Sequence, residues 1–421
     1  MSTTASDERR AGGYPLLVLG VLIVAYTFNF LDRQILGILA GSIKNDLGLT
    51  DSQLGLMGGL AFALFYTGLG VPIAWLADRW SRTWIMTGAL ALWSAFTAAC
   101  GLATGFWPLF LCRMGVGVGE AGGVAPSYAL IAEHVPPQRR ARAMAIFFLG
   151  IPIGSALGLF FGGWLAQAVD WRAAFVVIGI AGLPVAWLIA RFVPNATPEP
   201  ATETAPFFEV LGELAAKPSF WFLSLGAASG SICGYGFGFW LPSFFSETLG
   251  LSLRNIGAYY GSIVLVGGAL GIWLGGVASD RLGVARPAAY PAVPATAFLL
   301  SVPAYVVAVS TASRGLAWLL FAFAYALSLA WLGPITTAIQ GLVAPGRRAT
   351  ASACFLLFVN LIGLGFGTFI FGFAADRLRP AYGTEAMRAA ILGGLGFYVL
   401  AALLCGLAVT TIRRDAESPN I

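Results

Sequence analysis

The chain has 421 residues, of which 58% are hydrophobic and only 10% are charged. A soluble domain carries about 25% charged residues, so this composition excludes an ordinary soluble protein and indicates one embedded in a lipid bilayer. The formal net charge of +5 does not indicate a nucleic-acid partner, because the basic residues stand in short clusters between apolar runs.

Twelve apolar runs follow one another, each long enough for a membrane-spanning helix of about 20 residues. The first is too long for the core of a signal peptide, so we expect it to be the first span. Lys and Arg gather in alternate connections, which predicts a multi-pass plasma (inner) membrane protein with both termini in the cytoplasm. The runs lie near 15–42, 52–77, 83–105, 107–132, 142–168, 171–193, 219–247, 254–279, 286–310, 314–343, 348–375 and 386–412.

One connection is unlike the others. Residues 194–218 are rich in Pro, Thr and Glu, which predicts a cytoplasmic linker between an N-terminal six-helix bundle (1–193) and a C-terminal one (219–421). The segment FFEVLGEL within the linker is expected to form a short interfacial helix. The expected fold is therefore all-α, with twelve transmembrane helices in two pseudo-symmetric bundles.

Four charged residues lie inside the expected spans of the first half: Asp32, Arg33, Arg113 and Glu120. Each costs at least about 2.5–3.5 kcal/mol at mid-bilayer, which favours a functional role over a purely structural ion-pair network. The helical rise of about 1.5 Å per residue places them at similar depths. We expect Asp32 and Arg113 to pair, Glu120 to lie one step deeper, and Arg33 to face a central cavity.

These four residues suggest proton exchange at Asp32 and Glu120, with Arg33 or Arg113 receiving an anionic group. Weakly polar and aromatic residues of both halves are expected to line the rest of the cavity. They are Tyr26, Asn29, Ser231, Tyr235, Trp331, Thr336 and Asn360.

The same dipeptide ends spans two and eight, where Asp78-Arg79 and Asp280-Arg281 occupy corresponding positions of the two halves. Such repetition is typical of secondary transporters. Together with Arg82, these residues are expected to form a cytoplasmic gate that latches in one state, although positive-inside anchoring explains Arg79 and Arg82 equally well.

The residue inventory excludes several classes. The chain has one histidine and five cysteines without paired spacing, so no metal site is expected. Its two lysines do not follow glycine, which excludes a phosphate-binding loop for ATP. No cofactor is expected other than protons as coupling ion. A membrane enzyme or a channel stays possible, and saturable counterflow would separate a carrier from a pore.

Several motifs resemble the major facilitator superfamily. The run DRWSR at 78–82 is similar to its loop motif after span two, Arg113 with Gly117 and Gly119 to its span-four motif, and the glycines of 154–163 to its span-five motif, with Leu159 where proline is usual. A narrower resemblance is to the Spinster family. It lies in NFLDR at 29–33, GVGEA at 117–121, AP at 125–126 and IPIGS at 151–155.

The Spinster resemblance implies alternating access, proton coupling, and an amphiphilic anionic or zwitterionic substrate such as a lysolipid or sphingosine phosphate. A proton-coupled carrier of small organic anions or drug-like molecules is the alternative. The expected partners are the bilayer and the small substrate, and we expect a monomer that is not an enzyme.

Overall fold

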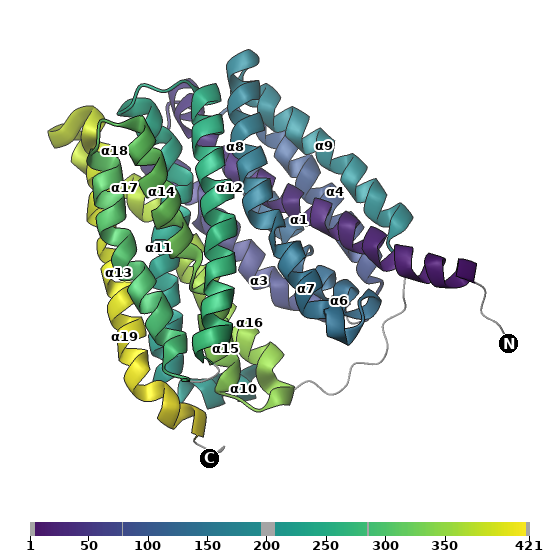
Figure 1. The fold of residues 1–421 in the computed structure, drawn as a ribbon. Helices are drawn as coiled ribbons and strands as arrows, with labels where there is room; N and C mark the ends of the chain where they lie inside the picture. Colours follow the sequence, from purple (N-terminus) through teal and green to yellow (C-terminus); the bar gives the residue numbers. More distant parts are fainter. Residues whose placement is uncertain (1–4, 78, 195–206, 284–285, 418–421) are drawn as a thin grey trace.

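The computed structural model describes residues 5–77, 79–194, 207–283 and 286–417, and every regular element among them is helical. Nine helices belong to the first half of the chain (Figure 1). They are α1 (Ala5–Leu47), α2 (Asp51–Gly58), α3 (Leu60–Ala77), α4 (Arg82–Cys100), α5 (Phe106–Glu120), α6 (Val124–His134), α7 (Pro137–Phe148), α8 (Gly150–Ala168) and α9 (Trp171–Phe192).

The linker contributes one short helix, α10 (Phe207–Ala215), and the second half contributes the rest. These are α11 (Pro218–Glu247), α12 (Leu253–Ala278), the π-helical η1 (Ser279–Gly283), α13 (Ala289–Ser310), α14 (Arg314–Leu329), α15 (Leu332–Gly341), η2 (Pro345–Arg347), α16 (Arg348–Phe358), the π-helical η3 (Val359–Leu364), α17 (Gly365–Tyr382), η4 (Gly383–Glu385), α18 (Ala386–Gly394) and α19 (Gly396–Glu417).

Within the described ranges, nine helices are long and apolar enough to cross a membrane. Three of the twelve expected spans do not appear as separate helices among these nine. The span near 386–412 continues from the preceding one in the run Thr350–Glu417. The span near 107–132 is divided between α5 and α6. The third, α11, is long but rich in serine and glycine.

The break between α5 and α6 falls directly after Glu120. The chain makes a turn over residues 121–123 before α6 starts at Val124. Gly119 and Gly122 allow this segment to lie against α4, because a Cβ at Gly119 would stand 2.7 Å from the backbone nitrogen of Trp93. Such breaks are tolerated in a bundle where neighbouring helices surround the freed backbone groups.

Close helix packing fixes the position of α1. Gly154 and Gly158 of α8 lie against the backbone carbonyls of Thr27 and Leu31, with no room for a side chain at either glycine. Small residues let membrane helices approach in this way, since lipid supplies no hydrophobic drive for their association. The α1–α8 contact therefore sets which face of α1 turns toward α5.

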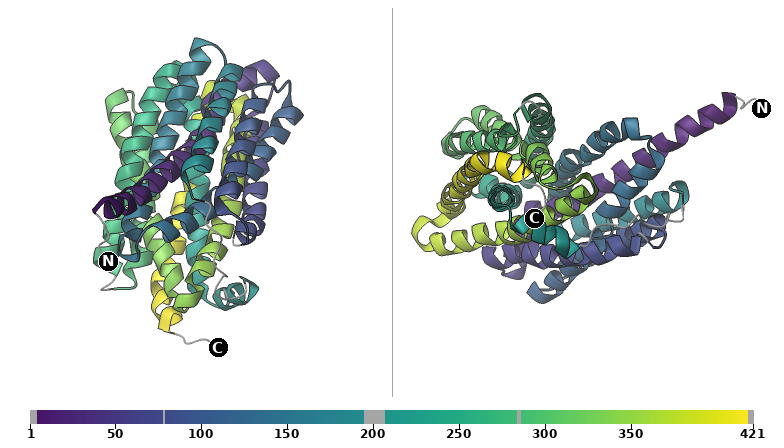
Figure 2. Two further views of the ribbon diagram at one scale, coloured as in Figure 1. Left: turned by 90° about the vertical axis from the view of Figure 1, so that its right-hand side faces the viewer. Right: turned by 90° about the horizontal axis from the view of Figure 1, so that it is seen from below.

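The two halves form separate groups of helices around a shared interface. Figure 2 (right) shows the purple-to-blue helices and the green-to-yellow helices occupying different sides when viewed from below. Helices α2 and α17, α8 and α12, and α1 and α11 form the principal contacts between the halves. The N-terminal part of α1 projects beyond the bundle (Figure 1).

The linker helix α10 packs on the second half. Val210 and Leu214 are buried, and α10 contacts α16 and α11. Arg347 forms ion pairs with Glu209 and with Glu213, the latter at 3.0 Å, and these carboxylates raise the pKa of Arg347. The expected helix in the linker is therefore present, and it is held by the C-terminal half.

Candidate functional site

An ion pair joins α1 to α5 in the interior of the first half. The Nε atom of Arg33 donates to an Oε atom of Glu120 at 2.7 Å. The Glu120 side chain is 0% exposed and the Arg33 side chain is 11% exposed. Glu120 occupies the last residue of α5, so the pair lies at the break between α5 and α6.

Aromatic rings surround the guanidinium group of Arg33. Its central carbon lies 5.0 Å from the ring centre of Phe30, 4.9 Å from that of Phe62 and 4.6 Å from that of Tyr66. A cation in contact with aromatic faces is stabilised by their quadrupoles, more strongly when water is excluded. Arg33 is therefore held in place by three rings as well as by Glu120.

Asp32 does not form the ion pair that was expected with Arg113. Asp32 accepts a hydrogen bond from the hydroxyl of Thr97 on α4, and no ion pair joins it to Arg113 among the described residues. The expected depths are compatible with either pairing, but the rotation of α1 set by its packing on α8 directs Arg33 toward Glu120. The pairing prediction was wrong, although all four charged residues lie on neighbouring helices as expected.

Several polar atoms of this cluster are buried without a hydrogen-bond partner in the described chain. They are Oδ1 of Asp32, Nη2 of Arg33, Nε and Nη1 of Arg113, and Oε1 of Glu120. Buried polar groups in proteins are rarely left unpaired. The cluster therefore has unused donors and acceptors for protons, water or a charged ligand.

Asn29 and Tyr26 lie about one and two helical turns from Arg33 along α1. Tyr26 stacks on Phe147 with ring centres 4.1 Å apart. Asn29 is 2% exposed, and both atoms of its amide group lack a partner within the described chain. It borders a small hollow with Ser127 of α6, so its side chain is available for polar contacts beside the ion pair.

Of the expected lining residues in the second half, Tyr235 on α11 packs against the apolar cluster of the first half. Ser231 lies next to Gly363 of η3, and Asn360 is a partly exposed residue of η3. Trp331 is 6% exposed and contacts Phe355 edge-to-face within its own half. Thr336 donates to the carbonyl of Leu332 in its own helix. Tyr235 is thus placed against the first half, and Asn360 lies on η3, which contacts α3 of the first half.

The expected cytoplasmic gate residues make no polar contact between the halves in the described part of the chain. Arg79 is exposed, and its guanidinium group lies 3.9 Å from the ring centre of Trp75. Arg82 forms an ion pair with Glu133 of the same half. Arg281 is exposed. Asp78 and the side chain of Asp280 lie outside what the structure describes.

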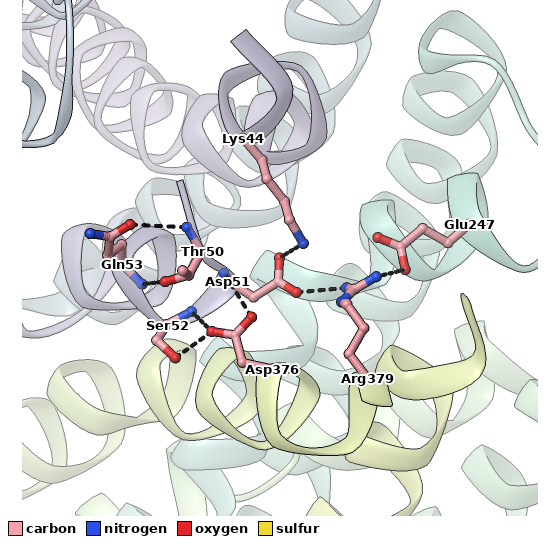
Figure 3. Close-up of polar contacts among 8 residues, drawn as sticks. All are labelled: Lys44, Thr50, Asp51, Ser52, Gln53, Glu247, Asp376 and Arg379. Carbon is pink, nitrogen blue, oxygen red and sulfur yellow. Dashed lines mark hydrogen bonds and ion pairs between the residues drawn. The ribbon is translucent and has the colours of Figure 1, made fainter. Parts of the chain in front are cut away.

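Polar contacts between the halves concentrate instead at the opposite end, which we call the outer end after its predicted side. Asp51, 2% exposed, accepts from Lys44 at 2.6 Å and from Arg379 of α17 at 2.6 Å (Figure 3). Arg379 also lies 3.6 Å from Glu247 of α11. From the sequence, Lys44 and Arg379 are expected only to contribute to the charge balance between the two sides of the membrane.

Asp376 completes this outer network by capping α2 from the other half. It accepts the backbone N–H groups of Asp51 at 3.1 Å and Ser52 at 2.7 Å (Figure 3). Thr50 accepts the N–H of Gln53 in the same turn. The first N–H groups of a helix have no partner inside it, so α2 obtains its cap partly from α17.

Comparisons with known proteins agree with this architecture. The Major Facilitator Superfamily model matches residues 22–368. An MFS-type efflux pump of Mycolicibacterium smegmatis is 35% identical over 94% of this chain and 93% of its own length. Protein spinster homolog 1 of Homo sapiens is 29% identical over 91% of this chain and 79% of its own.

A solved structure is similar over nearly the whole chain. It is a bacterial homolog to the human lysosomal transporter Spinster in an inward-facing and unoccupied conformation, with a TM-score of 0.85 and 32% identity over 96% of this chain and 99% of that one. The same homolog in an inward-facing and occupied conformation gives a TM-score of 0.83.

The helical bundles and their buried charges thus define a multi-pass membrane transporter rather than a membrane enzyme. The chain belongs to the major facilitator superfamily and, within it, to the Spinster family.

Proposed function

We propose that the chain is a proton-coupled transporter that moves an amphiphilic anionic or zwitterionic molecule by alternating access. The observation that carries this proposal is the Arg33–Glu120 ion pair, fully buried on the Glu120 side and positioned at a helix break. Transport itself follows from the family. The coupling ion, the substrate class and the residue roles are the proposal.

Proton coupling would arise because Arg33 and a proton compete for the Glu120 carboxylate. Burial favours the neutral form of a carboxylic acid, whereas an adjacent cation favours the charged form. While Arg33 contacts Glu120, the carboxylate is charged. When an anionic headgroup draws Arg33 away, Glu120 loses its counter-charge and takes up a proton. Asp32, with Thr97 as its only hydrogen-bond partner in the described chain, is the proposed second proton site beside Arg113.

The surroundings of the Arg33 guanidinium group support the proposed substrate class. Its guanidinium group offers an unpaired Nη2 donor, and the three aromatic rings around it offer apolar surface. Arginine suits phosphate and carboxylate recognition because its donors form a planar fork. A molecule with one anionic end and an apolar body fits both features.

The outer network supports the proposed alternation between inward-facing and outward-facing states. Among the described residues, the polar contacts between the halves all lie at the end formed by α2, α8, α12 and α17. This arrangement supports an inward-facing state, in which the outer end is closed. We assign this end to the outside of a plasma membrane and both termini to the cytoplasm, and we propose that the protein acts as a monomer.

The test is transport into proteoliposomes under an imposed pH gradient. Glu120→Gln keeps the shape of the side chain but cannot exchange a proton, so we expect loss of gradient-driven transport with measurable binding of a fluorescent lysolipid. Glu385→Gln, which alters an exposed pair with Arg388, is the matched control. Unchanged pH dependence in Glu120→Gln would exclude Glu120 as the coupling site.

A carrier of drug-like molecules is the second candidate, favoured by the 35% identity to a protein named as an efflux pump. The same arginine and aromatic rings would accept a small apolar anion. Thermal stabilisation of the purified protein distinguishes the two substrate classes. If lysolipids stabilise the purified protein against heat and small aromatic carboxylates do not, the amphiphile is supported, and the reverse result supports the drug-like substrate.

A further inference from the structure

A groove runs along the membrane-facing side of the first half, apart from the buried charges. Its volume is about 500 Å³, within the range of roughly 300–1,000 Å³ that is usual for ligand pockets. Nearly all of its lining is apolar. The lining residues come from α3, the turn before α4, α4, α5 and the turn after α5: Ile73, Leu76, Trp80, Ser81, Trp84, Ile85, Gly88, Ala89, Leu92, Val118, Gly119 and Gly122.

The missing side chains of three glycines shape this groove. Gly119 and Gly122 form its floor, where each lies against α4 too closely for a side chain. Gly88 is exposed, and a Cβ at this position would meet no atom within 4 Å. The groove is therefore open at Gly88, and a larger residue there would fill it without a clash against the protein.

The length and direction of the groove suit a hydrocarbon chain. From Trp84 to Leu92 it follows α4 for about 12 Å at the helical rise of 1.5 Å per residue. Trp80 and Trp84, which line one end of the groove, are 67% and 59% exposed. Exposed tryptophans at the ends of spans mark the headgroup level of a bilayer, so the groove extends from the headgroups toward the hydrocarbon interior.

A positive charge, Arg79, stands directly before the lining residue Trp80 in the chain. Arg79 is exposed, stacks on Trp75 and donates to the backbone carbonyl of the same residue at 3.2 Å. It forms no ion pair with any carboxylate that the structure describes. Arg82 beside it is already paired with Glu133. Arg79 is therefore an exposed cation next to the groove with no carboxylate partner among the described residues.

We propose that this groove binds a phospholipid of the surrounding membrane, with one acyl chain along α4 and an anionic headgroup at Arg79. The apolar lining accounts for the acyl chain and Arg79 for the headgroup preference. The proposal rests on the chain being a membrane protein and is independent of which substrate it transports. The bound lipid would contact Gly119 and Gly122, the two glycines on either side of the segment that begins with Glu120.

Native mass spectrometry of the delipidated full-length protein tests the proposal. With dioleoyl phosphatidylglycerol, the wild type should retain one lipid. Gly88→Leu places a side chain in the groove and should weaken binding about tenfold, equivalent to lost contact with roughly two methylene groups. Gly68 of α3 is also exposed and open but does not line the groove, so Gly68→Leu should bind the lipid as the wild type does.

The headgroup part of the proposal has its own test. Phosphatidylcholine should bind more weakly than phosphatidylglycerol to the wild type, and Arg79→Gln should remove that preference while leaving binding of phosphatidylcholine unchanged. Equal retention of phosphatidylglycerol by the wild type and Gly88→Leu would overturn the proposal. So would a dimeric mass that is lost in Gly88→Leu, because the groove would then be an interface with a second copy.

Discussion

The outer network should set the balance between the inward- and outward-facing states, and Asp376 is the position at which to test it. Replacing Asp376 with alanine removes the acceptor of two backbone N–H groups of α2, at 3.1 and 2.7 Å, and of the Ser52 hydroxyl. All of these bonds cross between the halves, and none of them holds either half together.

The size of the expected shift in equilibrium follows from the kind of hydrogen bond that Asp376→Ala removes. A hydrogen bond to a charged group contributes about 1.5–3 kcal/mol, but in the outward-facing state water would satisfy the same N–H groups, and part of that energy is recovered. A net loss of about 2 kcal/mol shifts a two-state equilibrium about thirtyfold. We expect the outward-facing state to rise by this factor in Asp376→Ala, with little change in thermal stability.

Pulsed electron paramagnetic resonance measures the shift. Spin labels at Asn45→Cys and Thr384→Cys, two exposed residues at the outer end of opposite halves, should give a longer distance when that end opens. The matched control is Asp46→Ala, because Asp46 is at the same end but pairs with Arg172 in its own half. It should leave the distance distribution unchanged.

Two results would refute this reasoning: an unaltered distance distribution in Asp376→Ala, or an equal shift in Asp46→Ala. If Asp376→Ala does not fold, Arg379→Gln removes the bond to Asp51 from the same helix and should open the outer end in the same direction.

Two further predictions concern α1. Gly158→Val inserts a side chain against the carbonyl of Leu31, so it should lower the free energy of unfolding by about 1–3 kcal/mol, whereas Gly41→Val, which meets no atom within 4 Å, should not. Thermal unfolding in detergent measures both, and equal melting temperatures would contradict the packing argument. Thr97→Val removes the hydroxyl that donates to Asp32. It should destabilise the fold by about 1–3 kcal/mol and change the pH profile of transport; a stability loss with the wild-type profile would assign Thr97 a structural role alone.

The sequence predicted which charged residues converge, but not how they pair. Depth along a span follows from the helical rise, and depth alone brought Asp32, Arg33, Arg113 and Glu120 together. Pairing depends on the rotation of each helix about its axis, which the α1–α8 contact determines. Thr97 was missed because a threonine in an apolar span carries no signal that separates a partner of Asp32 from an ordinary lining residue.

The outer network was missed for a different reason. Lys44 and Arg379 are separated by most of the chain, and each resembles an ordinary loop charge. Lys44 reaches Asp51 locally from the end of α1, but only the arrangement of α2 against α17 brings Arg379 to it. The helix breaks were also not predicted, since glycine within an apolar run is compatible with both a straight and a broken span. The helix in the linker was predicted, because its amphipathic pattern is local.

The linker helix α10 is attached to the second half. Arg347 and the buried Val210 and Leu214 fix α10 to the second half, while Phe208 on its outer face is 82% exposed and available to the bilayer surface. An exposed aromatic side chain at the headgroup level resists displacement along the membrane normal. We therefore expect the second half to be the more firmly anchored at the membrane surface, and the first half, which has the buried charges, to move relative to it.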